Sequence, residues 1–137
     1  PCSDGAFTLI DDSYNANPDS VPAGIRVLAV TDGKRKIAVL GDMLELGENA
    51  LEIHKDLADD LIENKIDLVF AVGENCGAMF DVLPERMRGA KASLSSEIAP
   101  VVAATVKSGD TVLVKGSLGS EMVAVVDALK NISNLSE

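Results

Sequence analysis

Apolar residues form four short continuous runs along the chain, and amphipathic segments separate them. The runs span residues 7–10, 37–40, 68–72 and 112–114, with a weaker apolar stretch at residues 92–94. Strands buried on both faces of a parallel sheet have this continuous apolar character, whereas strands with one solvated face alternate. We therefore expect these runs to be strands of a sheet that helices cover on both faces.

Three segments between and after the runs have apolar residues at helical spacing. The stripes comprise Leu51, His54, Leu57, Ala58, Leu61 and Ile62; Ile98, Val101, Val102, Thr105 and Val106; and Leu118, Met122, Val125, Val126 and Leu129. Asn49 and Glu52 have the spacing of a capping box at the start of the first of these helices. The alternation of strands and helices predicts an α/β fold with a doubly wound, mostly parallel sheet flanked by helices.

The first helix poses a local problem. Asn17 and Pro18 would cap and begin a helix, but Pro22 deep inside it would clash with the carbonyl four residues earlier. We expect this helix to start late or to kink at Pro22.

Composition narrows the picture to one acidic domain. The chain has 137 residues and a formal net charge of −10, and its basic residues are scattered apart from the run Lys34-Arg35-Lys36. Nucleic acids and anionic membrane surfaces bind clustered basic residues, so we expect neither as a partner. The length predicts a single domain over residues 1–137 with one sizeable core.

Cysteine usage and the chain ends bear on the cellular context. Cys2 and Cys76 form no Cys-x-x-Cys pair, so the sequence suggests neither a disulfide framework nor a zinc site, and we assign no metal ligand. A signal-peptide pattern and a bilayer-length apolar stretch are both missing. We expect a cytoplasmic protein and, because residue 1 is not Met, a piece of a longer polypeptide.

The segment after the first apolar run is unusually polar. It reads Asp11-Asp12-Ser13-Tyr14-Asn15-Ala16-Asn17-Pro18-Asp19-Ser20. Asn17 and Pro18 suffice to begin a helix, which leaves the other polar groups unexplained. Ligands of open α/β sheets bind at the carboxyl ends of strands. This segment is therefore either a ligand-binding loop or a solvated turn rich in Asp and Asn.

Three further loops follow predicted strands. Residues 41–47 (Gly-Asp-Met-Leu-Glu-Leu-Gly) form either a site or a plain connection with glycines at its ends, and residues 73–77 favour a turn and a helix cap. Residues 115–120 (Lys-Gly-Ser-Leu-Gly-Ser) have the composition of an anion or carboxylate site at a helix N-terminus. Alternatively, Lys115 extends into solvent and the glycines only allow close packing.

Several catalytic motifs are missing. The sequence contains neither a phosphate-binding Gly-x-x-x-x-Gly-Lys-Ser/Thr loop nor a Gly-x-Gly-x-x-Gly dinucleotide motif, so it does not encode a complete nucleotide enzyme. His54 is the only histidine, and its place on an apolar stripe favours a hydrogen-bonded core residue over a catalytic one. A hydrolase triad is not indicated, because no Gly-x-Ser-x-Gly motif accompanies it.

Read together, these loops resemble one family. Residues 11–20, 38–47 and 114–117, with His54, are similar in order and spacing to the carboxyl-terminal domain of the Mur ligases of bacterial cell-wall synthesis. The resemblance covers about residues 7–129. Within the family it is to the members that add D-alanyl-D-alanine to UDP-N-acetylmuramoyl-tripeptide.

The resemblance implies a Rossmann-like third domain of a three-domain, ATP-dependent amide-bond ligase. In this family ATP phosphorylates a peptide carboxylate, the incoming amine attacks the acyl phosphate, and a tetrahedral intermediate expels phosphate. The central domain holds the phosphates of ATP and Mg²⁺. This chain would be inactive alone and would close over the central domain with nucleoside and acceptor contacts, positioning substrates and excluding water.

The resemblance also implies roles for individual residues. Asp12 would accept hydrogen bonds from ribose hydroxyls, and Asn15 and Asn17 would lie beside the adenine with Tyr14 in support. The residues assigned to D-alanyl-D-alanine are Asp42, Glu45, Lys115, Gly116 and Ser117. Lys115 and Ser117 could hold its carboxylate, whereas Asp42 and Glu45 could orient its ammonium group or only shape their loop.

His54 also matches a family position, and we expect it to support the site without acting as the base. Leu118 and Pro22 depart from the family pattern, since a polar residue and an ordinary helix former are expected there. Two alternatives stay open. The chain could belong to a Mur ligase that adds another amino acid, although the Asn-rich loop in place of a His-containing version argues against this. It could also be a non-catalytic α/β domain that binds a nucleotide or small molecule.

Overall fold

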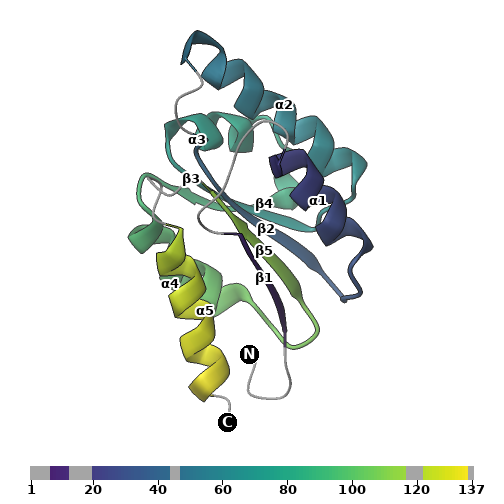
Figure 1. The fold of residues 1–137 in the computed structure, drawn as a ribbon, viewed down its shortest axis with the longest axis vertical. Coiled ribbons are helices and arrows are strands. Elements are labelled where there is room, and N and C mark those ends of the chain that lie inside the picture. Colours follow the sequence, from purple (N-terminus) through teal and green to yellow (C-terminus); the bar gives the residue numbers. More distant parts are fainter. Residues whose placement is uncertain (1–6, 13–19, 44–46, 117–121, 136–137) are drawn as a thin grey trace.

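The computed structural model describes residues 7–12, 20–43, 47–116 and 122–135, and these form a parallel sheet between two layers of helices (Figure 1). The strands are β1 (Thr8–Asp12), β2 (Lys36–Gly41), β3 (Leu68–Val72), β4 (Arg88–Ala92) and β5 (Thr111–Lys115). Their order across the sheet is β1-β5-β2-β3-β4, and every neighbouring pair is parallel. The predicted α/β fold with a doubly wound parallel sheet is confirmed.

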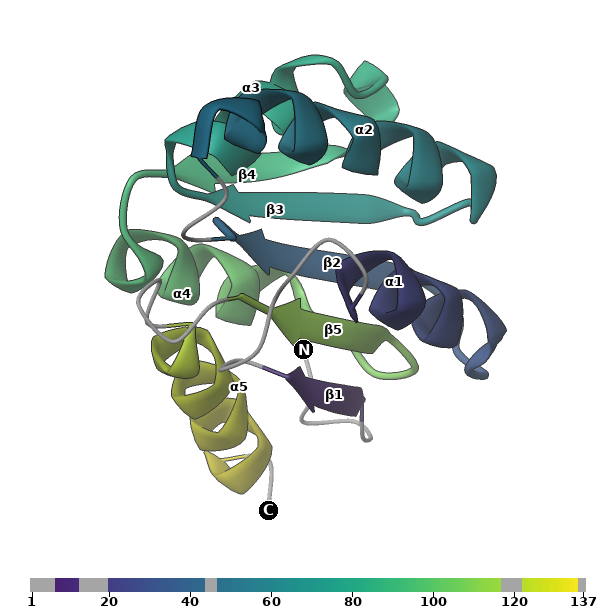
Figure 2. The same cartoon turned by 45° about the horizontal axis from the view of Figure 1, so that its top comes forward.

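Helices cover both faces of the sheet. One face carries α1 (Ser20–Val30), α2 (Ala50–Glu63) and α3 (Glu74–Asp81), and the other carries α4 (Ser95–Thr105) and α5 (Val123–Leu135), as Figure 2 shows. Short 3₁₀ turns precede α2 at Gly47–Asn49 (η2) and β4 at Glu85–Met87 (η3). Among the described residues, no helix is both long enough and apolar enough to span a membrane.

Two cores result from the alternation of side chains along each strand. Leu113 of β5 packs with the α1, α2 and α3 side, whereas its neighbours Val112 and Val114 pack with α4 and α5. All of these side chains are at most 1% exposed. A strand buried on both faces needs apolar residues at successive positions, which explains the continuous runs in the sequence.

The fourth strand is displaced from its predicted position. The weaker apolar stretch at residues 92–94 overlaps only the last residue of β4, which occupies Arg88–Ala92. This strand lies at the edge of the sheet, and both Arg88 and Lys91 are exposed. The exposed charged residues interrupt the continuous apolar pattern that was used to find the other strands.

The predicted helical stripes are mostly buried, with exceptions at their margins. His54, Leu57, Ala58 and Leu61 of α2 are at most 3% exposed, as are Ile98, Val102 and Val106 at α4 and Met122, Val125, Val126 and Leu129 at α5. Leu51, Ile62 and Val101 are instead 46%, 39% and 41% exposed. Leu118 lies outside the described residues.

Two local predictions concern helix starts. The prediction of a capping box is wrong, because Asn49 makes no side-chain hydrogen bond to the start of α2. Pro22 lies in the first turn of α1, where a missing N–H leaves no helical hydrogen bond unmade. The late start or kink expected for this helix stays a prediction, because residues 13–19 lie outside the described residues.

The amino edge of the sheet is closed by an ion pair. The Nε and Nη2 atoms of Arg35 donate to the two carboxylate oxygens of Asp110 at 3.0 and 2.7 Å. Asp110 is 2% exposed, and its hydrogen bond raises the pKa of Arg35. The turn at residues 108–110 contains Gly109 at a φ of 91°. This ion pair therefore links the residue before β2 to the residue before β5.

Candidate functional site

The carboxyl ends of β1, β5 and β2 lie side by side. Lys115 at the end of β5 is in register with Asp12 of β1 on one side and with Leu40 of β2 on the other. The helix after β5 covers the face opposite to the helices after β1 and β2 (Figure 2). Such a reversal opens a crevice at the carboxyl edge of a doubly wound sheet, which is where ligands of this fold class bind.

Four predicted site residues fall at this edge. Asp12 is the last residue of β1, Lys115 is the last residue of β5 with Gly116 directly after it, and Asp42 follows β2 directly. The remaining loop residues of the predicted site lie outside the described residues: Tyr14, Asn15, Asn17, Glu45 and Ser117.

Lys115 does not extend into solvent. It is 1% exposed and packs against α1, where a Cβ atom added to Gly24 would lie 3.0 Å from the Lys115 Cδ atom. The alternative of a solvated lysine at the strand end is therefore wrong.

Asp42 caps a helix that follows a different strand. Its Oδ1 atom accepts a hydrogen bond from the main-chain N of Cys76 at 2.8 Å, and its Oδ2 atom accepts one from Asn75 at 3.2 Å. These N–H groups belong to the first turn of α3, which has no partner for them within the helix. Of the two roles expected for Asp42, the structure shows the loop-shaping one.

Gly73 allows this approach. Its φ is 103°, and a Cβ atom there would lie 2.5 Å from the Asp42 carboxylate. Any other residue would meet both a strained backbone and a steric clash. The turn and cap predicted for residues 73–77 therefore exist, with the capping carboxylate supplied from β2.

His54 is a fully buried link between α2 and the loop after β2. Its Nε2 atom accepts a hydrogen bond from the main-chain N of Met43 at 2.8 Å, so the neutral ring carries its proton on Nδ1. Nδ1 then donates to the main-chain O of Ala50 at 2.6 Å. This is the core histidine that its position on the apolar stripe predicts, and in this arrangement neither nitrogen is available to take a proton from a substrate.

Cys76 joins Asp42 and His54 in a polar cluster that the sequence does not reveal. One ligand-type atom from each of the three side chains lies within 4.8 Å of the other two. Burial, together with the charge of Asp42 and a hydrogen bond to it, raises the pKa of Cys76 well above its usual range. The thiol is therefore protonated and a poor nucleophile in this environment.

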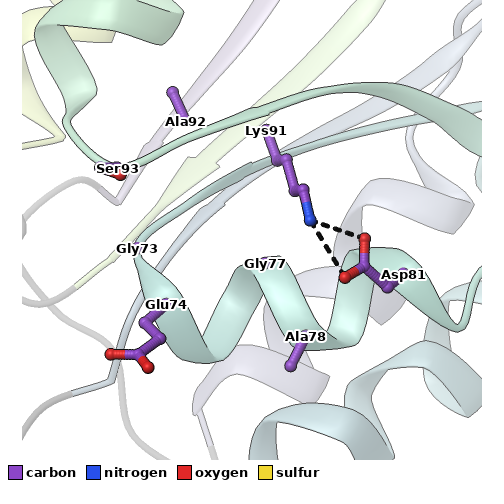
Figure 3. Close-up of a pocket in the computed structure, with 8 residues that line it drawn as sticks. All are labelled: Gly73, Glu74, Gly77, Ala78, Asp81, Lys91, Ala92 and Ser93. Carbon is purple, nitrogen blue, oxygen red and sulfur yellow. Dashed lines mark hydrogen bonds and ion pairs between the residues drawn. The ribbon is translucent and has the colours of Figure 1, made fainter.

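A shallow groove adjoins this cluster on the side of the edge strand β4. It has a volume of about 700 Å³ and is bordered by Gly73 and Gly77 of the α3 region and by Lys91 of β4 (Figure 3). Lys91 Nζ pairs with the two carboxylate oxygens of Asp81 at 2.8 and 3.0 Å, and both side chains are exposed. Exposed ion pairs contribute little to stability, so both groups can exchange partners with a ligand.

Comparisons with known proteins identify similar chains. The model of the family described as Mur ligase, glutamate ligase domain, matches residues 2–118. Relatives named UDP-N-acetylmuramoyl-tripeptide--D-alanyl-D-alanine ligase include those of Haemophilus influenzae and Escherichia coli. They are 34% and 36% identical over 90% and 89% of this chain. The chain spans only 27% and 26% of the length of these two relatives.

A solved structure is similar as well. The MurF ligase of Thermotoga maritima in complex with ADP superposes with a TM-score of 0.77 and 30% sequence identity. The match covers 96% of this chain and 30% of that one.

Proposed function

This chain belongs to the Mur ligase family, and from that premise we propose that residues 1–137 form the carboxyl-terminal domain of a ligase that adds D-alanyl-D-alanine to UDP-N-acetylmuramoyl-tripeptide. The observation that carries the proposal is the match of some 90% of the chain to relatives bearing that name. The ligase would work in the cytoplasm, in peptidoglycan synthesis.

The reaction divides between domains in this proposal. The chain lacks a phosphate-binding loop, so another domain would hold the phosphates of ATP and Mg²⁺. This domain would supply contacts to the nucleoside and to the acceptor dipeptide. The ADP complex of the similar Thermotoga maritima MurF ligase supports a nucleotide as one ligand. Closure of this domain would align the amine with the acyl phosphate and exclude water.

The nucleoside contacts are proposed for the loop that begins at the end of β1. Asp12 would accept hydrogen bonds from the ribose hydroxyls, and Asn15 and Asn17, with Tyr14 nearby, would contact the adenine. Support comes from the position of Asp12, which is in register with Lys115. Its strand β1 pairs with β5, and the helix after β5 covers the opposite face of the sheet from the helix after β1. Crevices at such reversals are the usual nucleotide sites of doubly wound sheets.

The acceptor contacts are proposed for the loops after β5 and β2. Ser117 and the main chain of Gly116 would hold the dipeptide carboxylate, and buried Lys115 would stabilise the negative charge of that carboxylate. Glu45 would orient the ammonium group. Asp42 and His54 would act indirectly, because their polar atoms bond to main-chain groups of the surrounding loops.

The test uses the full-length protein that contains this chain. We expect ATP-dependent phosphate release that requires both UDP-N-acetylmuramoyl-tripeptide and D-alanyl-D-alanine. The Asp12→Asn variant should raise the KM for ATP by about 5- to 30-fold, which corresponds to the loss of about 1–2 kcal/mol from hydrogen bonds to the ribose. The matched control is Asp59→Asn on the exposed side of α2, and it should leave this KM unchanged.

Substrate and binding controls separate the alternatives. Turnover with a single amino acid in place of the dipeptide would assign the chain to another Mur ligase. Submicromolar ATP binding by residues 1–137 alone, measured by calorimetry, would favour a self-sufficient nucleotide-binding domain. The proposal expects weak binding, because most phosphate contacts would lie elsewhere.

A further inference from the structure

The polar cluster of Asp42, His54 and Cys76 brings three kinds of metal-ligand atom together. The carboxylate, imidazole and thiol come from the loop after β2, from α2 and from α3, and the ligand-type atoms lie within 4.8 Å of one another. His54 and Cys76 have no exposed surface. Neither spacing nor a motif in the sequence indicates this group, since the fold alone assembles it.

The imidazole is already oriented as in many metal sites. Nδ1 donates to the main-chain O of Ala50 at 2.6 Å, which fixes the ring and leaves the lone pair on Nε2. Histidine ligands of metals usually donate their second N–H to a carbonyl or carboxylate in this way. The lone pair of Nε2 now accepts the main-chain N–H of Met43, so an ion would take the place of that hydrogen bond.

The carboxylate is equally well held. The two oxygens of Asp42 each accept one main-chain N–H, from Asn75 and Cys76, and the carboxylate also bonds to the Cys76 thiol. A carboxylate has about four acceptor positions, and the one that the thiol uses becomes available when the thiol loses its proton to bind an ion. The two hydrogen bonds would keep the carboxylate in place while it binds.

The thiol is the group that an ion would change most. Burial and the neighbouring carboxylate keep Cys76 protonated. A divalent cation between the thiol and Asp42 would offset both effects, and the thiol would lose its proton as the S–metal bond forms. The balanced step is the addition of one divalent ion to the neutral thiol, giving a metal-bound thiolate and one released proton.

We propose that Asp42, His54 and Cys76 bind a thiophilic divalent cation of the Zn²⁺ or Cd²⁺ class. Mixed sulfur, nitrogen and oxygen ligands suit these ions, whereas Mg²⁺ prefers oxygen alone. In a tetrahedral zinc site the ligand atoms are about 3.3–3.7 Å apart, so distances within the cluster would shorten by up to about 1.5 Å on binding. Because the ion displaces the Met43 N–H from His54, binding would also shift the loop after β2.

The experiment titrates the 137-residue chain with Cd²⁺ and follows the thiolate-to-metal charge-transfer absorption in the ultraviolet. The only cysteines are Cys2 and Cys76, so two matched variants identify the ligand. We expect one Cd²⁺ per chain with the wild type and with Cys2→Ser, and loss of the absorption band with Cys76→Ser. Asp42→Asn and His54→Gln should each weaken binding by at least about tenfold. One proton should be released per ion at neutral pH.

Two further measurements keep the test decisive if Cys76→Ser does not fold. X-ray absorption of the wild-type Zn²⁺ complex should show one sulfur and otherwise nitrogen or oxygen neighbours, and the Met43 amide should lose its protection from hydrogen exchange when Zn²⁺ binds. An all-oxygen and nitrogen shell, an unchanged Met43 amide, or a band that disappears in Cys2→Ser would overturn the proposal. No nucleotide or peptide substrate enters these assays, so their outcome is independent of the proposed ligase activity.

Discussion

The carboxylate of Asp42 lies 2.8 Å from the main-chain N of Cys76, although the two residues are 34 positions apart in the chain. The side chain that follows β2 thereby caps the helix that follows β3. Because β2 and β3 are neighbours, with Gly41 in register with Val72, one carboxylate can join two adjacent strand-end loops. The carboxyl edge of the sheet is thus held by polar contacts as well as by packing.

Replacing Asp42 should loosen α3. In the Asp42→Asn variant an amide group would face at least one main-chain N–H of the first helical turn, and we expect the free energy of unfolding to fall by about 1–2 kcal/mol. Urea denaturation monitored by circular dichroism measures this. The Asp59→Asn control, on the exposed side of α2, should change stability by less than about 0.5 kcal/mol. Equal effects of the two substitutions would argue against the capping role.

Replacing His54 should release the loop after β2. The His54→Phe variant keeps an aromatic ring but removes the acceptor of the Met43 N–H, which should cost about 1–3 kcal/mol of stability. His54→Gln, which can place an oxygen near the position of Nε2, should cost less. Hydrogen exchange of the Met43 amide distinguishes the variants directly, since it should quicken with Phe. A protected amide in that variant would show that another group satisfies it.

Two helical glycines should respond in opposite directions to alanine. Alanine is the better helix former by about 1 kcal/mol. At Gly77 of α3 the added Cβ would lie 3.7 Å from Lys91 Cδ, an ordinary contact, so Gly77→Ala should stabilise the fold by about 0.5–1 kcal/mol. At Gly24 the Cβ would lie 3.0 Å from buried Lys115, so Gly24→Ala should give no gain or a loss. Thermal unfolding of the two variants checks the contrast, and a similar gain at both sites would show that Lys115 can move aside freely.

The buried thiol predicts a dependence of stability on alkaline pH. The pKa of Cys76 in the fold lies above its ordinary value of 9.0, so the unfolded thiol ionises first as the pH rises. The unfolded state then binds fewer protons than the folded one. The contribution of Cys76 to the free energy of unfolding is therefore fully present below the pKa of the unfolded thiol. Above that pKa it falls by about 1.4 kcal/mol per pH unit.

The difference in unfolding free energy between wild type and Cys76→Ala isolates this effect. With chelator present, we expect the difference to be constant up to about pH 8 and to shrink from pH 9 upward. Cys2→Ala provides the control and should keep the wild-type slope. If the dependence of the unfolding free energy on pH disappears in Cys2→Ala, the effect belongs to Cys2 and not to Cys76.

The hydrophobic pattern predicts those parts of the fold that are buried on both sides. The runs that became β2, β3 and β5 are continuous because helices cover both faces of these interior strands. The run in β1 is continuous as well, although β1 is an edge strand whose apolar residues are only partly buried. For β4 this reasoning fails, since exposed Arg88 and Lys91 lie on an edge strand. Lys115 illustrates another limit: its burial depends on contact with Gly24, and no local pattern connects residues 91 positions apart.

The candidate site divides in the same way. Asp42 and His54 stand out in the sequence as a polar residue in a strand-end loop and a lone histidine on an apolar stripe. Cys76 does not, because its proximity to both depends on which strands are neighbours and in what register. A strand order of β1-β5-β2-β3-β4 is a property of the whole chain, and it is this order that gathers the three residues.

The same strand order also determines when the sheet can form. Among the described strands β1 comes first in the chain, yet it pairs only with β5, which comes last. A chain emerging from the ribosome can pair β2, β3 and β4 as they appear, but the N–H and C=O groups of β1 have no strand to bond until Thr111–Lys115 is made. β5 must then enter between β1 and β2, so an interior strand of the finished sheet is the last one added. A chain cut before β5 would leave β1 unpaired and the edge of β2 exposed to other chains.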